Sequence, residues 1–435
     1  MKRCFIIFLI FAMCSLILNC DSVSGNSKSP ILPEVPSPEP IPPPDPNYGE
    51  NFIYIENNQF MVNGKRIWIN GVNTPWNNWN DFGGNYNNNW WDTHFALLKQ
   101  NGINATRIWI NCNSQCAISL NTNGTVNNVN SSHWTHLDQL FELAKKHEIY
   151  IMATLLSFDH FKTPSSGPDT SYRWREMLTN RQALNFAANY TIPFVNRYKN
   201  NPFLWSIDIM NEPDWVHEEM GMNWADISYF LAVQAAAIRE NSKVLVTVGI
   251  AYAKWNTGNQ NPIGNNHAQE GNKVSDQYLQ GLYNNPNAKL DFWSPHHYDW
   301  CSQWYGVPHY LTPNGTRLGS GTGDVNNMNT GWHGGYGLPT GAAAKPAVIG
   351  ECSANGTTML DRVNIRAAER PPENNIINDY EFAFNNGWQG VMAWTSNNVD
   401  GNGGLISGGG RPPNDLGLAT KNMLDKHSNL IFPNN

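Results

Sequence analysis

Two glutamates in this sequence each lie at the end of an apolar segment that predicts a buried strand. Glu212 follows residues 204–210, and the next residue, Pro213, cannot donate a ladder hydrogen bond, so the strand should stop there. Glu351 ends a second apolar segment, which starts at residue 345. A carboxylate at a strand end lies at the mouth of a sheet rather than in its core, so the pair indicates acid–base chemistry.

Strands and helices alternate along the chain from residue 66 onward, which predicts a parallel sheet with helical crossovers. The expected strands are 66–73, 105–110, 149–158, 204–212, 244–251, 292–298, 345–351 and 389–395. The expected helices are 91–100, 133–147, 181–198, 224–240, 376–386 and 418–426. Residues 300–344 show no clear helical period, so we expect a degraded helix or a long loop there. Such an alternation predicts an α/β fold, a (β/α)8 TIM barrel with long βα loops.

A short β-hairpin should precede the first barrel strand. Residues 52–55 and 59–65 have strand-like sequences, and Asn63-Gly64 favours the tight turn of a hairpin. We expect this hairpin to close the bottom of the barrel.

The Asn-Glu-Pro strand end, followed by a Gly-Glu strand end, resembles the cellulase-type glycoside hydrolases, family 5 of the large retaining (β/α)8 clan. In such a barrel the active site lies at the carboxyl ends of the strands. The resemblance implies that Glu212 is the general acid/base and Glu351 the nucleophile. Retaining hydrolysis requires two such carboxyl groups roughly 5–5.5 Å apart.

The segment Ser294-Pro-His296-His297-Tyr298 resembles the sixth strand of that family, in which a His-X-Tyr pair serves the two carboxylates. The spacing of two residues places His296 and Tyr298 on one face of a strand. Tyr298 would hold Glu351 in its charged form, and His296 would hydrogen-bond near the acid/base or the substrate. The alternative is a pair of buried polar residues without a catalytic role, and we expect His297 to be structural.

Three further residues match the family pattern. Asn211 can donate and accept hydrogen bonds beside Glu212. Arg107 would be an expensive buried charge without a carboxylate, and the matching arginine in the family pairs with the nucleophile, although a bridge to a structural acid is an alternative. Trp394 matches the tryptophan that stacks on the sugar ring being cleaved, although it could be a core residue. Other candidates for outer subsites are Asp159, His160, Trp76, Trp79, Trp90, Trp215, Trp255, Trp300 and Trp304.

The composition suits a carbohydrate substrate better than a charged polymer. The chain has 28 basic and 35 acidic side chains, and no run of Lys or Arg that could follow a nucleic acid. Its 18 Trp and 16 Tyr provide flat faces for sugar rings. The first strand carries no His-X-His, and the histidines are scattered, so we expect no metal and no cofactor. We expect a monomer.

The amino terminus resembles an export signal. Residues 1–20 have a basic start and an apolar run, and the segment Ile17-Leu-Asn-Cys20 is similar to a bacterial lipobox. Residues 21–50 form a proline-rich linker, and residues 51–435 should be a single catalytic domain. We therefore expect a secreted or surface-anchored protein whose only membrane attachment is a lipid on Cys20, with simple secretion as the alternative.

Four cysteines lie outside the signal segment: Cys112, Cys116, Cys301 and Cys352. Exported proteins commonly form disulfides, but the spacing leaves the pairing open. A zinc site is not indicated, because no second pair with ligand spacing follows Cys112 and Cys116.

These patterns together predict a retaining endo-β-1,4-glycanase that hydrolyses a plant cell-wall polysaccharide, either a cellulose-like β-glucan or a mannan. Glucan and mannan differ in the orientation of one hydroxyl group, so the sequence leaves this choice open. The alternatives are a non-catalytic carbohydrate-binding lipoprotein on the same barrel and an exo-acting β-glycosidase.

The expected lipid anchor can be tested with a Cys20→Ser variant expressed in a bacterium. Wild-type protein should partition with membranes because acyl chains on Cys20 supply the attachment, and the variant should be released. Fractionation followed by immunoblotting measures the distribution. Recovery of the mature wild-type protein wholly in the medium would contradict the anchor.

Overall fold

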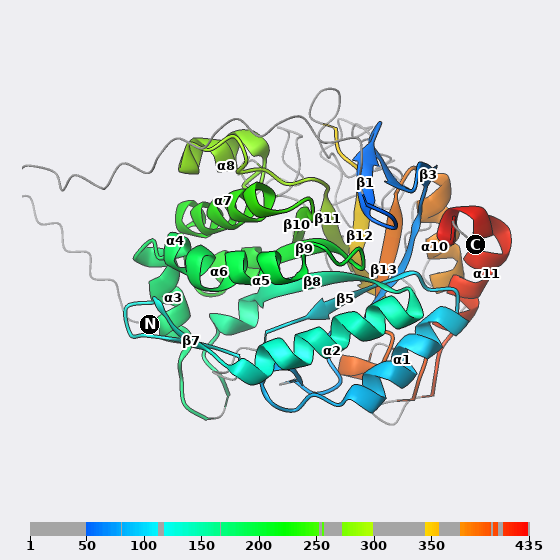
Figure 1. Ribbon diagram of the computed structural model, residues 1–435, viewed down its shortest axis with the longest axis horizontal. Helices are drawn as coiled ribbons and strands as arrows, with labels where there is room; N and C mark the ends of the chain where they lie inside the picture. Colours follow the sequence, from blue (N-terminus) through cyan, green and yellow to red (C-terminus); the bar gives the residue numbers. More distant parts are fainter. Residues whose placement is uncertain are drawn as a thin grey trace, which may run out of the picture. The chain divides into compact units, whose positions relative to one another are not determined.

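Eight parallel strands in the described part of the chain close into a barrel, in the spatial order β10-β11-β12-β13-β4-β5-β8-β9 (Figure 1). The strands are β4 (Ile69–Asn73), β5 (Ala105–Trp109), β8 (Tyr150–Ser157), β9 (Leu204–Asn211), β10 (Leu245–Ile250), β11 (Ser294–His297), β12 (Val348–Ser353) and β13 (Gly390–Trp394). All are almost fully buried, which explains why most of them are rich in apolar residues, whereas β11 has the sequence Ser-Pro-His-His. The predicted (β/α)8 barrel is confirmed.

This computed structural model describes residues 49–79, 81–111, 117–165, 167–251, 255, 272–298, 344–355, 375–401, 403–407 and 412–433. The chain divides into two units, Met1–Pro44 and Asp45–Asn435. The predicted signal segment, the lipobox and nearly all of the linker lie outside the described residues, as do Cys112, Cys116 and Cys301. Cys352 is a buried free thiol. The predicted domain boundaries therefore stay predictions, and the pairing of the cysteines stays open.

Helices flank the strands as the alternation predicts. The longer ones are α1 (Asn88–Gln100), α2 (Ser131–His147), α7 (Trp224–Asn241), α10 (Asn375–Asn385) and α11 (Leu416–Ile431). Asn87 caps α1 by accepting a hydrogen bond from the Trp90 amide at 3.1 Å, and Asn130 caps α2 in the same way. Helices α1 and α2 pack side by side in the lower part of Figure 1. No helix in the described part of the chain is long and apolar enough to cross a membrane.

The predicted helix 181–198 is interrupted. It consists of α4 (Ala183–Phe186), a π-helical turn η3 (Ala187–Thr191) and α5 (Ile192–Tyr198). Pro193 lies in the first turn of α5 and has no amide hydrogen to donate, so the regular α-helical hydrogen-bond pattern is interrupted before it.

Several short elements were not predicted, because each is too short to show a period. They are the hairpin β6 (Ile118–Leu120) with β7 (Val126–Val129), and the helices α3 (Ser171–Thr179), α6 (Pro213–Glu218) and α8 (Asp276–Tyr283). The short 3-10 turns η1 (Asp81–Gly83), η2 (Phe158–His160) and η6 (Val399–Gly401) lie in loops that follow strands. Most of the predicted loop 300–344 falls outside the described residues.

The N-terminal hairpin and its predicted Asn63-Gly64 turn are present, together with a second turn that was not predicted. Strands β1 (Ile53–Glu56) and β2 (Gln59–Val62) are joined at Asn57-Asn58, where both residues have positive φ, 50° and 59°. The predicted Asn63-Gly64 turn joins β2 to a third strand, β3 (Lys65–Arg66). The first barrel strand is therefore shorter than the predicted 66–73, since Arg66 belongs to this small sheet and β4 begins only at Ile69.

Phe60 of β2 fixes this sheet against the amino-terminal end of the barrel. Its fully buried ring packs edge-on against Trp205, at the start of β9, with a centroid distance of 5.4 Å, and against Phe292, just before β11, at 5.3 Å. The hairpin thus covers the end of the barrel opposite the strand ends that carry Asn211 and Trp394, as expected for a plug.

Candidate active site

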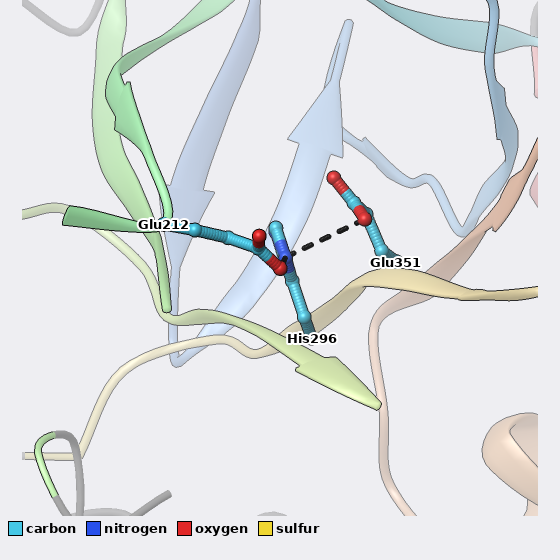
Figure 2. A group of neighbouring side chains, drawn as sticks. All are labelled: Glu212, His296 and Glu351. Carbon is cyan, nitrogen blue, oxygen red and sulfur yellow. Dashed lines mark hydrogen bonds and ion pairs between the residues drawn. The ribbon is translucent and has the colours of Figure 1, made fainter. Parts of the chain in front are cut away.

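The structure brings Glu212 and Glu351 together on opposite sides of His296 (Figure 2). Glu212 directly follows β9, whereas β12 continues to Ser353, two residues beyond the predicted strand end at Glu351. In the sheet, His296 of β11 pairs with Glu351 of β12. One oxygen of each carboxylate and one nitrogen of His296 lie within 4.8 Å of one another. This separation agrees with the roughly 5–5.5 Å between carboxyl groups in retaining glycosidases.

Glu212 has a setting that favours its protonated form. Its Oε1 lies 2.8 Å from Nδ1 of His296, and the residue is only 8% exposed. Burial raises the pKa of Glu212 to about 7, against the attraction of Arg107, because a buried carboxylate loses its hydration. The backbone at Glu212 is left-handed, with φ of 49°, and its amide donates to the Gly249 carbonyl at 2.8 Å. This turn aims the side chain into the barrel mouth.

Glu351 has two strong partners that orient it. Nη1 of Arg107 donates to Oε1 at 2.6 Å, and the Tyr298 hydroxyl donates to Oε2 at 2.7 Å. Burial nevertheless raises the pKa of Glu351 above its ordinary value, while His296, Arg107 and Tyr298 oppose this increase. The expectation that Glu351 is charged rests on the contacts with Arg107 and Tyr298 alone and does not include the cost of burial.

Arg107, in the middle of β5, is completely buried and connects several strands. Its Nη2 donates to Asp208 at 2.6 Å and to Asn211 at 2.8 Å, and its Nη1 also donates to Asn73 at 3.1 Å. Both alternatives considered for this arginine therefore apply, since it contacts the predicted nucleophile and also bridges to a second acid. Its guanidinium lies 4.2 Å from the centre of the Trp109 ring.

Asp208, which shares Arg107 with Glu351, was not predicted from the sequence. Asp208 is fully buried in β9, and its Oδ1 accepts a hydrogen bond from the Gly249 amide at 3.0 Å. A signal was present, because an aspartate within an apolar strand needs a cationic partner as much as Arg107 needs an anionic one.

The charges of this cluster do not balance in the described residues. Asp208, Glu212 and Glu351 are three buried carboxyl groups, and the Arg107 guanidinium forms ion pairs with Asp208 and Glu351. Burial also lowers the pKa of His296 to about 4, so this imidazole is neutral near pH 7. Keeping a proton on one acid avoids a second uncompensated buried charge. Glu212 is the acid without a direct ion pair to Arg107 in the described structure, so it is the one expected to hold the proton.

The two glutamates open into a cavity of about 520 Å³. Its wall includes Trp76, Trp79, Trp109, Trp215, Tyr298, Trp394, Phe158, Asp159, Lys162, Asn211, Glu219 and Asp400. Trp394 is 9% exposed and is wedged between the edges of Trp76 and Trp109, with centroid distances of 6.1 and 5.1 Å. It therefore packs against neighbouring rings and still borders the cavity.

The other residues proposed for outer subsites either do not border the cavity or lie outside the described residues. Trp90 stacks on His94, and Trp255 is buried against His217 and Trp224, so neither borders the cavity. His160 is buried against Trp174, and His297 is 1% exposed. Trp300 and Trp304 lie outside the described residues.

Glu212, His296 and Glu351 also form a set of groups that could ligate a metal ion. Their other contacts argue against that use. The Arg107 guanidinium and the Tyr298 hydroxyl each donate to one oxygen of Glu351, and a fixed cation at 2.6 Å repels a metal ion. The arrangement suits a carboxylate pair that exchanges protons better than a metal centre.

Comparisons with known proteins agree with this chemistry. A mannan endo-1,4-β-mannosidase from Mytilus edulis is 25% identical over 277 residues, which cover 57% of this chain and 72% of that protein. Another from Cryptopygus antarcticus is 22% identical over 389 residues, covering 81% and 86%. The solved β-1,4-mannanase of Aplysia kurodai has a TM-score of 0.62 at 23% identity, covering 87% of this chain and 98% of that one. No protein-family model matches the sequence.

The similar sequences share a hydrolytic activity on glycosidic bonds, and the similar structure shares the barrel. The role of each site residue stays a prediction, whereas the class of protein does not. The chain is a glycoside hydrolase with a (β/α)8 barrel, similar in sequence to two mannan endo-1,4-β-mannosidases and in fold to a solved β-1,4-mannanase.

Proposed function

We propose that this protein is a retaining endo-β-1,4-mannanase that uses Glu212 as acid/base and Glu351 as nucleophile. The observation that carries the proposal is the pair of nearby glutamates with unequal partners at the wall of an aromatic cavity. The choice of mannan over glucan is supported by two related sequences, both mannan endo-1,4-β-mannosidases.

In the first chemical step, a Glu351 oxygen attacks the anomeric carbon while Glu212 gives its proton to the departing glycosidic oxygen. The glycosidic bond breaks, and an ester forms between the sugar and Glu351. Arg107 and Tyr298 orient the attacking carboxylate through their 2.6 and 2.7 Å contacts. Glu212 becomes a carboxylate in the same step.

In the second step, Glu212 acts as a base. It takes a proton from water, the water oxygen attacks the anomeric carbon, and Glu351 leaves as a carboxylate. Arg107 and Tyr298 now stabilise the charge that returns to Glu351, so the same contacts that orient attack also assist departure. Two inversions retain the β configuration.

The cavity provides binding surfaces for several sugar units. Trp394, Trp76, Trp79 and Trp215 present aromatic rings along it, which suits stacking on the C–H faces of a polysaccharide. This arrangement supports cutting within the chain rather than at its end. We also propose that the protein acts outside the cell, either free or anchored through Cys20, on the strength of its amino-terminal sequence.

Hydrolysis assays on a panel of polysaccharides test the substrate class. We expect the highest kcat/KM on β-1,4-mannan and glucomannan, lower values on carboxymethylcellulose, xylan and mixed-linkage glucan, and an early fall in viscosity. A preference for carboxymethylcellulose would identify the enzyme as a glucanase rather than a mannanase. Release of monosaccharide from the start at constant viscosity would indicate an exo-acting enzyme, and binding without hydrolysis would indicate a non-catalytic protein.

The pH dependence of kcat/KM should be bell-shaped, because Glu212 must be protonated and Glu351 ionised. Activity should fall as pH rises above about 7, where Glu212 loses its proton, and fall again at low pH, where Glu351 gains one. In Glu212→Gln, assayed on an activated aryl β-mannoside, the alkaline limb should disappear because an amide does not ionise. An unchanged alkaline limb in this variant would assign it to another group.

Azide rescue separates the two glutamates. With an activated aryl β-mannoside, Glu351→Ala plus azide should give the α-mannosyl azide, because azide replaces the nucleophile from the opposite face. Glu212→Ala plus azide should give the β-mannosyl azide, because azide then opens the ester without needing a base.

Both variants should lose at least about 100-fold activity on mannan. Glu142→Ala, a change at an exposed position of α2, is the control and should keep wild-type turnover. Proton NMR identifies the azides and the first sugar released by the wild type. Wild-type release of the α-anomer, or near-normal turnover by Glu351→Ala, would overturn the assignment.

A further inference from the structure

His296 lies between two strands that each lose their regular register next to it. The pairing of β10 with β9 shifts between Thr247 and Gly249, and the pairing of β12 with β13 shifts between Ile349 and Cys352, an interval that contains Gly350. Such irregularities in a strand redirect side chains and are common near active sites. A glycine at such a point often marks the close approach of another group.

Both glycines leave space that a side chain would fill. A Cβ atom on Gly249 would lie 2.5 Å from Nε2 of His296 and 3.0 Å from Nη2 of Arg107. A Cβ atom on Gly350 would lie 2.3 Å from the Ser294 hydroxyl oxygen and 3.1 Å from Cδ2 of His296. Neither glycine has a positive φ, so their backbone conformations are open to other residues and the constraint is space alone.

We propose that Gly249 and Gly350 are positioning residues of the active site, forming a slot that places Nδ1 of His296 between the two glutamates. The inference rests on the proposed roles of Glu212 and Glu351. In this position Nδ1 lies 2.8 Å from Glu212 and 3.6 Å from Glu351 (Figure 2). A ring moved by the width of a methyl group would lose the shorter contact, since hydrogen bonds weaken steeply beyond about 3.5 Å.

The slot also determines which ring nitrogen carries the proton. Nε2 of His296 is buried, has no hydrogen-bond partner in the described part of the chain, and approaches the same point beside Gly249 as the Arg107 guanidinium. A proton on Nε2 would face a fixed cation, so the neutral ring keeps its proton on Nδ1. His296 then donates to Glu212 whenever Glu212 is ionised, which is the state that must activate water.

The backbone of Gly249 has a separate role that a substitution would leave in place. Its amide donates to Asp208 at 3.0 Å, and its carbonyl accepts from the amide of Glu212 at 2.8 Å. An alanine keeps both of these groups. A Gly249→Ala variant therefore tests the space of the slot rather than these two hydrogen bonds.

The test compares Gly249→Ala with wild type on an activated aryl β-mannoside. We expect kcat to fall by about 100-fold, the loss typical of a reacting group displaced by about 1 Å, while KM changes by less than about threefold. The alkaline limb of the pH profile should move to higher pH, because Glu212 loses a donor to its charged form.

Gly71→Ala is the matched control, since Gly71 lies in another barrel strand and its Cβ would meet the flexible side chain of Met392 at 3.1 Å. It should keep the wild-type kcat and pH profile. A folded Gly249→Ala variant that keeps the wild-type kcat and the wild-type alkaline limb of the pH profile would overturn the proposed slot.

Two measurements without substrate keep the slot testable if the proposed function fails. In a thermal-unfolding cycle, Gly249→Ala should lower Tm in the wild type but have a much smaller effect in His296→Ala, where the ring is absent. Equal losses in both backgrounds would overturn the proposal.

Nitrogen NMR of labelled histidine, with His296→Ala used for assignment, should show protonated Nδ1 in the wild type, and a protonated Nε2 would contradict the slot.

An inactive wild type with these two results intact would reject the proposed function while leaving the geometry of the slot standing. An active wild type, together with a Gly249→Ala variant that has the wild-type kcat and pH profile, would reject the slot and leave the proposed function standing.

Discussion

The site depends on one buried cation. Arg107 is inaccessible to solvent and donates to Asp208, Glu351, Asn73 and Asn211, which come from three other strands of the barrel. A buried guanidinium is tolerable only if its donors are satisfied, so these residues must hold their positions for the barrel to be stable. The same requirement keeps the predicted nucleophile in one orientation. Stability of the fold and geometry of the site are therefore constraints on the same hydrogen bonds.

Much of the fold could be predicted because its signals are local. Most barrel strands are short apolar runs, most helices show an apolar stripe, and acids at strand ends identify the mouth of the barrel without any knowledge of packing. The residues Glu212, Glu351, Arg107, Asn211, His296, Tyr298 and Trp394 could be named for the same reason, together with the resemblance that their motifs carry. Topology then brings distant strand ends together, as the contact between Arg107 and Glu351 illustrates.

The features that sequence did not predict depend on contacts between strands. Asp208 stands out as an acid in an apolar strand, but its place beside Glu351 follows only from their shared contact with Arg107. The slot around His296 needs two strands to be out of register. The turn at Asn57-Asn58 was missed because Asn63-Gly64 is the stronger local signal and both turns exist. The pKa of Glu351 depends on its burial, which no motif reports.

The charge of the cluster explains how a buried site can run a reaction that moves protons. With Glu212 protonated, the described groups Arg107, Asp208 and Glu351 carry one net negative charge. When Glu351 forms its ester, that carboxylate becomes neutral and Glu212 becomes charged, so the net charge is unchanged. The proposed steps thus transfer a charge over a few ångströms between two oxygens that flank His296, rather than creating one in a medium that solvates it poorly. A neutral imidazole suits this exchange, because a charged His296 would bind both carboxylates too strongly in their ionised forms and suppress the acid on which the first step depends.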